Sequence, residues 1–297
     1  NTKLLFTKHY ADNQSESNYS SNLYEGILYA ATHGTDIINC SWGGYNTNTI
    51  AQDIISYVTL DLGCLVVAAA GNSNLETPIY PASYQHVLSV ASSDQNDVRS
   101  GFSNFGKTID IIAPGTGIYT TTYNNGYKTD SGTSLSAPIV SGAAALVWAN
   151  NPTFTSLQVA EQLRVSADET IYTKNPAYLN KLGKGRLDVL RALTLTSPSI
   201  RVSNELWVKD DGTSPGPGEN ARLYIDFTNY LQPSSSQLTA SLSSASPFIT
   251  IVKNEINLGI IPTNTTIRNS TTPFEVILSA ALPIDQKVEV LLTFTDG

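Results

Sequence analysis

Ser134 occupies a position where the sequence can present a nucleophile. It lies in the segment GTSLSAP (132–138), where a glycine turn leads into a run of small residues typical of a buried helix. A helix amino terminus presents backbone N–H groups and the positive end of the peptide dipoles, which favour developing negative charge. Pro138 falls in the first turn of this helix, where a missing N–H does no harm. The segment therefore predicts a serine hydroxyl beside donors suited to an oxyanion.

Two apolar runs end in residues that suit the same chemistry. The run CLVVAAAGN (64–72) ends on Asn72, whose side-chain amide is a hydrogen-bond donor, and DIINCSWGG (36–44) ends in glycines that expose backbone. Acyl transfer needs a nucleophile, an oxyanion donor and a backbone edge that can pair with an extended peptide. The three segments together contain residue types for all three roles.

The elements that must position these residues alternate along the first half of the chain. Helical spacing of apolar residues predicts helices over 20–34 and 47–63, and continuous apolar runs predict buried strands over 36–42, 64–72, 86–93 and 109–115. Buried strands separated by helices indicate a parallel sheet covered by helices on both faces. Ligands of such sheets bind beyond the carboxyl ends of the strands. This places Ser41, Gly43, Gly71 and Asn72 near any site.

The character of the chain changes near Ser197. Short alternating segments such as ARLYIDFTN (221–229) follow one another with Gly, Pro and Asp turns between them, which favours an all-β sandwich. We therefore expect an α/β domain over 1–196 and a sandwich domain, similar to Ig-like or fibronectin-like accessory domains, over 197–297. Trp207 and Tyr224 of the second domain are candidates for a sugar-binding platform, although core aromatic residues are commoner in sandwiches.

Seven motifs in the first domain resemble those of the subtilisin-like serine peptidases, in that family's order and at compatible spacing. They are IINCSWGG, VVAAAGN, YPASYQHVLSVASSD, FSNFG, IDIIAPG, GTSLSAPIVSGAAALV and GKGRLDVLRAL, and they extend across residues 1–193. The resemblance implies the subtilisin-like central parallel sheet, Ser134 as nucleophile and Asn72 as oxyanion donor. It also implies that Ser41, Trp42 and Gly43 on one side, and Ala69, Ala70 and Gly71 on the other, flank a polypeptide substrate and its first specificity pocket, which in the family often takes large apolar groups.

The same resemblance leaves the general base unaccounted for. The family's triad runs Asp, His, Ser, and its Asp and His motifs belong before the segment that corresponds to residues 1–8. HGTD (33–36) and DSG (130–132) imitate those motifs. However, His33 is expected at a helix end, and Asp130 lies too close to Ser134 along the chain to stand behind a histidine. His9 and His86 read as loop or strand-end residues. We expect a fragment that is incomplete at its N-terminus, carries the nucleophile without its base, and is nearly inactive alone.

Composition limits the partners. The net charge is −8, the pI is near 4.8 and no Lys/Arg run occurs, which argues against nucleic acid binding. No apolar stretch of about 18 residues predicts a membrane span. The chain starts at Asn1 and contains no Met, so we expect a cleaved or excised piece. A high content of Asn, Ser and Thr with few Lys residues is typical of an extracellular protein. Cys40 and Cys64 are predicted to be buried apolar residues.

Several alternatives stay open from the sequence. The missing strands could be supplied by the N-terminal segment or by another copy of the chain, since the sheet would otherwise expose an edge. An inactive peptidase-like binding protein, or a secreted adhesion or carbohydrate-binding protein acting through the sandwich, are the rival functions. No cofactor is expected. Calcium often stabilises members of the resembled family, but no acidic cluster here identifies ligands, and no other metal site is predicted.

Overall fold

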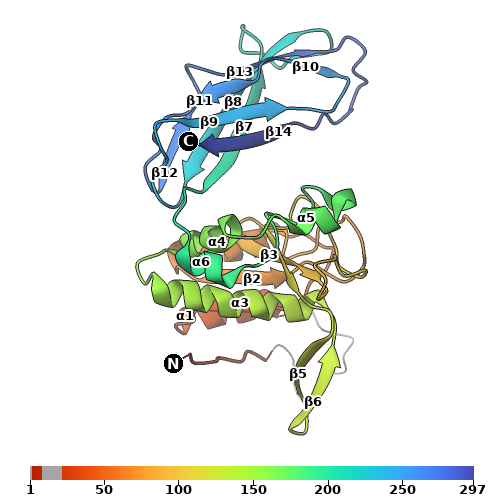
Figure 1. Ribbon diagram of the computed structural model, residues 1–297, viewed down its shortest axis with the longest axis vertical. Coiled ribbons are helices and arrows are strands. Elements are labelled where there is room, and N and C mark those ends of the chain that lie inside the picture. Colours follow the sequence, from red (N-terminus) through yellow and green to blue (C-terminus); the bar gives the residue numbers. More distant parts are fainter. Residues whose placement is uncertain (1, 9–21) are drawn as a thin grey trace. The chain divides into compact units, whose positions relative to one another are not determined.

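The chain forms two compact units, Asn1–Leu195 and Thr196–Gly297. The computed structural model describes residues 2–8 and 22–297, and Figure 1 shows its elements in chain order. Each unit has its own sheets and its own hydrophobic core.

The first unit is built on a parallel sheet with the strand order β1-β2-β3-β4. The strands are β1 (Ile37–Cys40), β2 (Leu65–Ala69), β3 (Val87–Ser93) and β4 (Ile111–Pro114), and every neighbouring pair is parallel. These are the four strands that the apolar runs predict. Because the strands are parallel, the segments that follow them emerge at one edge of the sheet.

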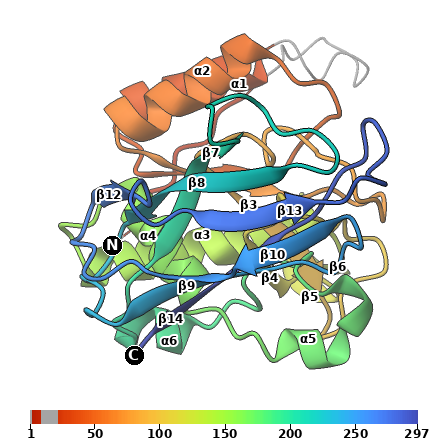
Figure 2. The same ribbon diagram turned by 90° about the horizontal axis from the view of Figure 1, so that it is seen from above.

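Helices cover both faces of this sheet. On one face lie α1 (Leu23–Thr32) and α2 (Thr49–Ser56), which continues into a π-helical turn (Tyr57–Asp61). On the other lie α3 (Thr133–Asn150), α4 (Ser156–Val165) and α6 (Val189–Thr194). Strand β2 shows why its sequence is apolar throughout: Leu65 and Val67 pack with α3, whereas Val66 and Ala68 pack with α1 and α2. The predicted α/β fold with helices on both faces (Figure 2) is confirmed.

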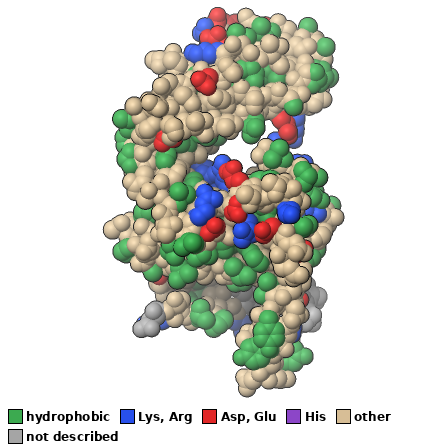
Figure 3. All heavy atoms as spheres, in the orientation of Figure 1, with side chains coloured by type: hydrophobic (Ala, Val, Ile, Leu, Met, Phe, Trp, Pro, Cys, Tyr) green, Lys and Arg blue, Asp and Glu red, His purple; other side chains and the backbone are tan. Residues whose placement is uncertain are grey.

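A hairpin that the apolar patterns do not predict precedes α3. Strands β5 (Ile118–Thr122) and β6 (Gly126–Asp130) pair antiparallel, and the rings of Tyr119 and Tyr127 stack with centroids 5.4 Å apart. Tyr119, Tyr123 and Tyr127 are exposed, and Figure 3 shows hydrophobic side chains gathered on this arm. The hairpin carries the chain from β4 to the start of α3. Two further short elements lie in the described part of this unit, α5 (Ile171–Lys174) and a 3₁₀ turn (Pro176–Tyr178).

The second unit contains two antiparallel sheets. One has the order β10-β13-β8-β12, with β7 paired to the other edge of β8, and the second has the order β11-β9-β14. The strands are β7 (Ile200–Val208), β8 (Asn220–Asn229), β9 (Leu238–Ser243), β10 (Ile249–Lys253), β11 (Glu255–Asn257), β12 (Thr265–Arg268), β13 (Phe274–Leu278) and β14 (Leu291–Asp296). Inward residues of both sheets, among them Phe227, Leu242 and Phe274, form one core. The membership of this unit in the Ig-like or fibronectin-like class remains a prediction.

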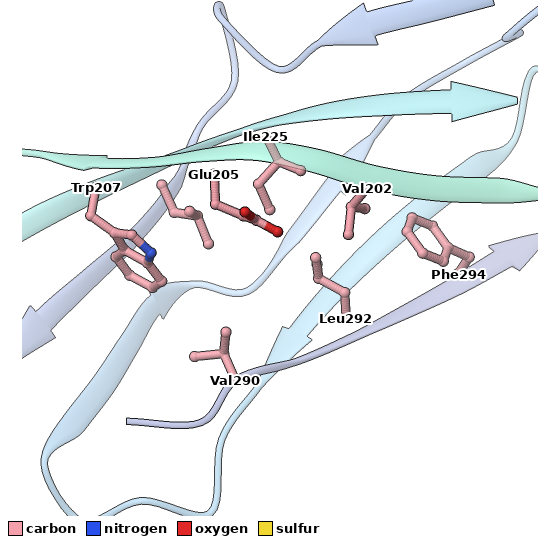
Figure 4. Close-up of a pocket in the computed structure, with 8 residues that line it drawn as sticks. Val202, Glu205, Trp207, Ile225, Val290, Leu292 and Phe294 are labelled. Atoms are coloured by element: carbon pink, nitrogen blue, oxygen red, sulfur yellow. The ribbon is translucent and has the colours of Figure 1, made fainter. Parts of the chain in front are cut away.

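Trp207 and Tyr224 do not form the sugar platform considered from the sequence. Trp207 is paired in register with the buried Leu223 and packs against the core, whereas Tyr224 is the next residue along β8. Successive residues of a strand point to opposite faces, so the two rings lie on opposite faces of the sheet. Trp207 instead lines a cavity of about 330 Å³ (Figure 4) whose walls are mostly apolar: Val202, Glu205, Trp207, Leu223, Ile225, Val290, Leu292 and Phe294.

Candidate active site

The start of α3 meets the segment that follows β1. The Ser134 hydroxyl, which is half-buried, donates a hydrogen bond to the carbonyl oxygen of Ser41 at 3.2 Å. In return, Ser41 Oγ donates to the carbonyl oxygen of Ser134 at 2.8 Å. Asn39 Nδ2 donates to Ser41 Oγ at 2.9 Å, so a residue of β1 orients the Ser41 hydroxyl. The two segments, 93 positions apart in the sequence, are held together by both bonds.

Asn72, which follows β2, is fixed to the same helix start by Thr133. Both the backbone N–H and the hydroxyl of Thr133 donate to Asn72 Oδ1, each at 2.9 Å. The Gly71 N–H in turn donates to Thr133 Oγ1 at 3.2 Å. Because these bonds occupy the amide oxygen, the amide orientation is set and the Nδ2 donor turns away from Thr133.

The two donors converge beside Gly132, the residue before the helix. A Cβ added to Gly132 would lie 3.5 Å from Asn72 Nδ2 and 3.7 Å from the backbone nitrogen of Ser134. The absence of a side chain at Gly132 therefore leaves a position that both nitrogen atoms approach within 4 Å. Gly132 is held there by a hydrogen bond from its N–H to the carbonyl of Gly115, after β4, at 2.8 Å. Segments after three strands thus define the site.

Gly71 must be glycine at this site for two reasons. Its φ of +102° lies in the region that favours glycine, and an added Cβ would come within 2.6 Å of Asn104 Nδ2. Asn104 is buried and braces the loop after β2: it accepts from Ser73 N at 3.0 Å and from Leu75 N at 3.2 Å. The motif FSNFG contains this positioning asparagine, but the sequence did not indicate its role.

The remaining predicted substrate residues lie around the same edge. Ala69 and Ala70 are 4% and 3% exposed, so both residues are buried at the carboxyl end of β2. Gly43 is exposed, next to the bridge in which Gly44 pairs with Tyr80. The Trp42 ring packs edge-on to Tyr24 of α1, with centroids 5.5 Å apart, and against the core below.

The histidines of the described chain lie away from Ser134. His33 ends α1, with Nδ1 2.7 Å from the carbonyl oxygen of Tyr29 and its ring stacked on the Tyr29 ring. His86 directly precedes β3, and burial lowers the pKa of its imidazole. Both therefore stand before the amino ends of their strands, whereas Ser41 and Asn72 follow the carboxyl ends. His9 lies outside the described residues.

Asp130, the last residue of β6, has a local partner. Lys128 Nζ lies 2.6 Å from Asp130 Oδ2, and the Ser131 N–H donates to Oδ1 at 2.8 Å. The hydrogen bond from Lys128, helped by that of Ser131, lowers the pKa of this exposed carboxyl group. The local contacts account for Asp130 without a role as the partner of a catalytic histidine.

Both cysteine thiols are buried, and the described residues contain no cluster of side chains that could hold a metal ion. Cys40 and Cys64 are free and buried, and burial raises the pKa of Cys40 to about 12. Within residues 2–8 and 22–297, no group of three or more His, Cys, Asp or Glu side chains is placed to hold a metal ion. Calcium therefore remains a prediction without ligands.

Within residues 2–8 and 22–297, no helix has the length and apolarity to cross a bilayer.

The site brings together the Ser134 hydroxyl, the Asn72 side-chain amide and the carboxyl ends of parallel strands, on a sheet that helices cover on both faces. Such a sheet defines an α/β fold whose ligand site lies at the strand ends. The family model described as "Subtilase family" matches residues 1–185, and the chain belongs to that family. Residues 186–297, which include the whole second unit, lie outside the match.

Relatives and solved structures agree with this assignment. The chain is 37% identical over 153 residues to alkaline elastase YaB of Bacillus sp. (strain YaB), covering 52% of this chain and 40% of that protein. It is 38% identical over 149 residues to thermitase of Thermoactinomyces vulgaris, covering 50% and 53%. The chain thus spans about half the length of the curated relatives it matches.

Two solved proteases have the same fold. The prenylagaramide maturation protease PagA superposes with a TM-score of 0.54 at 30% identity, covering 58% of this chain and 65% of that chain. The self-cleaved protease domain of PatA superposes with a TM-score of 0.52 at 32% identity, covering 58% and 66%. The resemblance predicted from seven motifs is confirmed at the level of family and fold.

Proposed function

We propose that the whole protein is a serine endopeptidase in which Ser134 is the nucleophile. The observation that carries this proposal is the position beside Gly132 that Asn72 Nδ2 and the backbone nitrogen of Ser134 both approach, at 3.5 and 3.7 Å from an added Cβ. An oxyanion formed by attack of Ser134 Oγ on a peptide carbonyl would receive two hydrogen bonds there. Both donors are held before the substrate arrives, so stabilising the anion requires little reorganisation.

The peptide substrate is proposed to bind as an added strand. Residues Ser41 to Gly43 follow β1, and Ala69 to Gly71 form the end of its parallel neighbour β2 and the segment after it, so the two segments lie on either side of the site. An extended peptide between them would place its scissile carbonyl beside Ser134. Trp42 contributes through its backbone in this arrangement, because its ring packs against Tyr24 and the core.

The general base is proposed to come from outside the described residues. The Ser134 hydroxyl donates a hydrogen bond to the backbone carbonyl oxygen of Ser41. This oxygen is too weak a base to remove the proton during catalysis. His33 and His86 precede β1 and β3, so they lie at the opposite end of the parallel strands from Ser41 and Asn72, and the four residues of β1 alone span roughly 13 Å. The described residues alone therefore supply only the donors and substrate binding, a contribution of about 10³-fold over water.

Labelling with an active-site fluorophosphonate tests the proposal. The full-length protein should be labelled at Ser134, its Ser134→Ala variant should not, and residues 1–297 alone should react far more slowly. Failure of the full-length protein to react would overturn the peptidase function. Rapid labelling of residues 1–297 alone would overturn the external base and leave the nucleophile in place.

One observation favours a second candidate, an inactive peptidase-like binding protein. The Ser134 hydroxyl is engaged by the Ser41 carbonyl rather than by a base. A full-length protein that binds unfolded polypeptide with the same affinity before and after Ser134→Ala, and never reacts with the fluorophosphonate, would be this binding protein.

We also propose an extracellular location, supported by the low Lys and high Asn, Ser and Thr content.

A further inference from the structure

Ile79 lies between the two segments that border the proposed substrate strand. A Cβ added to Gly43 would come within 2.5 Å of Ile79 Cγ2, and one added to Gly71 would come within 3.0 Å of Ile79 Cγ1. The side chain therefore touches the backbone that follows β1 and the backbone that follows β2 at once. It is 6% exposed, so it fills the space between these segments.

The backbone around Ile79 is tied on both sides. Tyr80 and Gly44 exchange two hydrogen bonds, at 2.8 Å and 2.9 Å. The Ile79 N–H donates to Ser83 Oγ at 3.2 Å, and the Ser83 N–H donates to the Ile79 carbonyl at 2.8 Å. A β-branched side chain on a fixed backbone has few accessible rotamers. The Ile79 side chain is therefore held in a fixed position.

The fixed position of the Ile79 side chain limits which substrate side chains can bind. This inference rests on the proposed function. If a peptide binds between residues 41–43 and 69–71 as proposed, a side chain before the scissile bond that projects between the two segments meets the space that Ile79 fills. Gly43 and Gly71 carry no side chain there, and Ile79 lies against both. A close-packed space does not admit a second large group without displacing the first.

We propose that Ile79 is the specificity-determining residue of this site and restricts cleavage to bonds that follow small residues such as Gly, Ala or Ser. This revises the expectation of a pocket for large apolar groups. One methylene in an enzyme pocket changes kcat/KM by about 10- to 200-fold. Since Phe exceeds Ala by a whole ring, we expect a preference for Ala over Phe of at least about 100-fold.

The test uses the full-length protein and two fluorogenic peptides that differ only in Ala or Phe before the scissile bond. The expected result is the Ala preference in the wild type, reduced at least about tenfold in Ile79→Gly through faster cleavage after Phe. Ile79→Val, which removes one methyl group and preserves β-branching, should shift the ratio in the same direction by less. Ile260→Gly, the same change at an exposed position of the second unit, should leave the ratio unchanged.

The outcomes separate this inference from the function on which it rests. A wild type that reacts with the fluorophosphonate at Ser134 yet cleaves after Phe as fast as after Ala overturns the role of Ile79 alone. A protein that never reacts with the fluorophosphonate overturns the peptidase function, and the specificity falls with it. If Ile79→Gly does not fold, the wild-type ratio and the Ile79→Val shift decide.

Discussion

The two units solve the problem of burying a sheet in different ways. All five residues of β2 in the first unit are buried, because helices cover both faces of its sheet. Along β8 of the second unit, buried and partly exposed residues alternate, because each sheet there packs on one face only. The chemistry follows from this difference: strands buried on both faces have only their ends available for ligands, and the polar site residues gather at those ends.

The largest expected effect separates the cores of the two units. Phe227→Ala should destabilise the second unit by about 3–5 kcal/mol, because Phe227 is fully buried between its sheets. The first unit should unfold as before, since it has its own core. Urea unfolding followed by tryptophan fluorescence measures the two transitions separately when Trp207→Phe leaves only Trp42 and Trp148 in the first unit, or when Trp42→Phe with Trp148→Phe leaves only Trp207 in the second. Ile284→Ala, at a residue 92% exposed, is the control and should change neither.

The next effect concerns the site alone. Asn72→Ala in the full-length protein should lower kcat by about 100- to 1,000-fold, the loss known for an oxyanion donor of subtilisin, a member of this family. KM should change little, because the donor acts on the transition state. Asn150→Ala, at the other end of α3, supplies the matched control. A kcat within threefold of the wild type for Asn72→Ala would remove the oxyanion role.

Two glycines with positive φ sharpen the comparison between the units. Gly71→Ala should cost about 3 kcal/mol, because backbone strain is added to a Cβ that meets Asn104 and Ile79. Gly212→Ala should cost only about 1 kcal/mol, since its φ is +81° but nothing lies within 4 Å of the added Cβ. Chemical denaturation measures both losses. Equal losses would mean that strain alone, and not the close approach of the site loops, requires glycine at Gly71.

The smallest effect is a pH dependence present in both units. A hydrogen bond from Thr170, aided by Arg186, lowers the pKa of Asp168 in the first unit, and Asn204 with Arg268 lowers that of Asp226 in the second. A carboxyl group with a lower pKa in the folded state stabilises the fold above its unfolded pKa of about 4, and this stabilisation is lost as the pH falls through the folded pKa. Each Asp→Asn variant should be less stable than the wild type at pH 6.

Urea midpoints at pH 6 and at about pH 2 check this sign. The deficit of Asp168→Asn should appear in the transition of the first unit, and that of Asp226→Asn in the transition of the second. Both deficits should shrink at the lower pH, where the wild-type carboxyl groups are also protonated. A deficit that is constant with pH would show that the carboxylate charge does not contribute.

Local patterns were sufficient for the sheet and for the identity of the polar residues. Apolar runs predicted β1 to β4, and the residues at their ends, Ser41 and Asn72, were found beside Ser134. The hairpin β5–β6 was not predicted, because its exposed strands carry Thr and Tyr without an apolar face. For the sandwich aromatics the sequence left a sugar platform open beside the commoner core position, because sequence spacing does not reveal which face of a sheet a ring joins until the register with β7 is known.

The sequence by itself determined the family, the four buried strands and the chemical types at the site, because those depend on motifs and on patterns along the chain. Only the tertiary structure decided that Thr133 orients Asn72, that Asn104 braces the loop after β2, and that Ile79 stands between Gly43 and Gly71. Each of these joins segments that are far apart in sequence. Their contacts arise from the packing of strand ends at one edge, which no local pattern encodes.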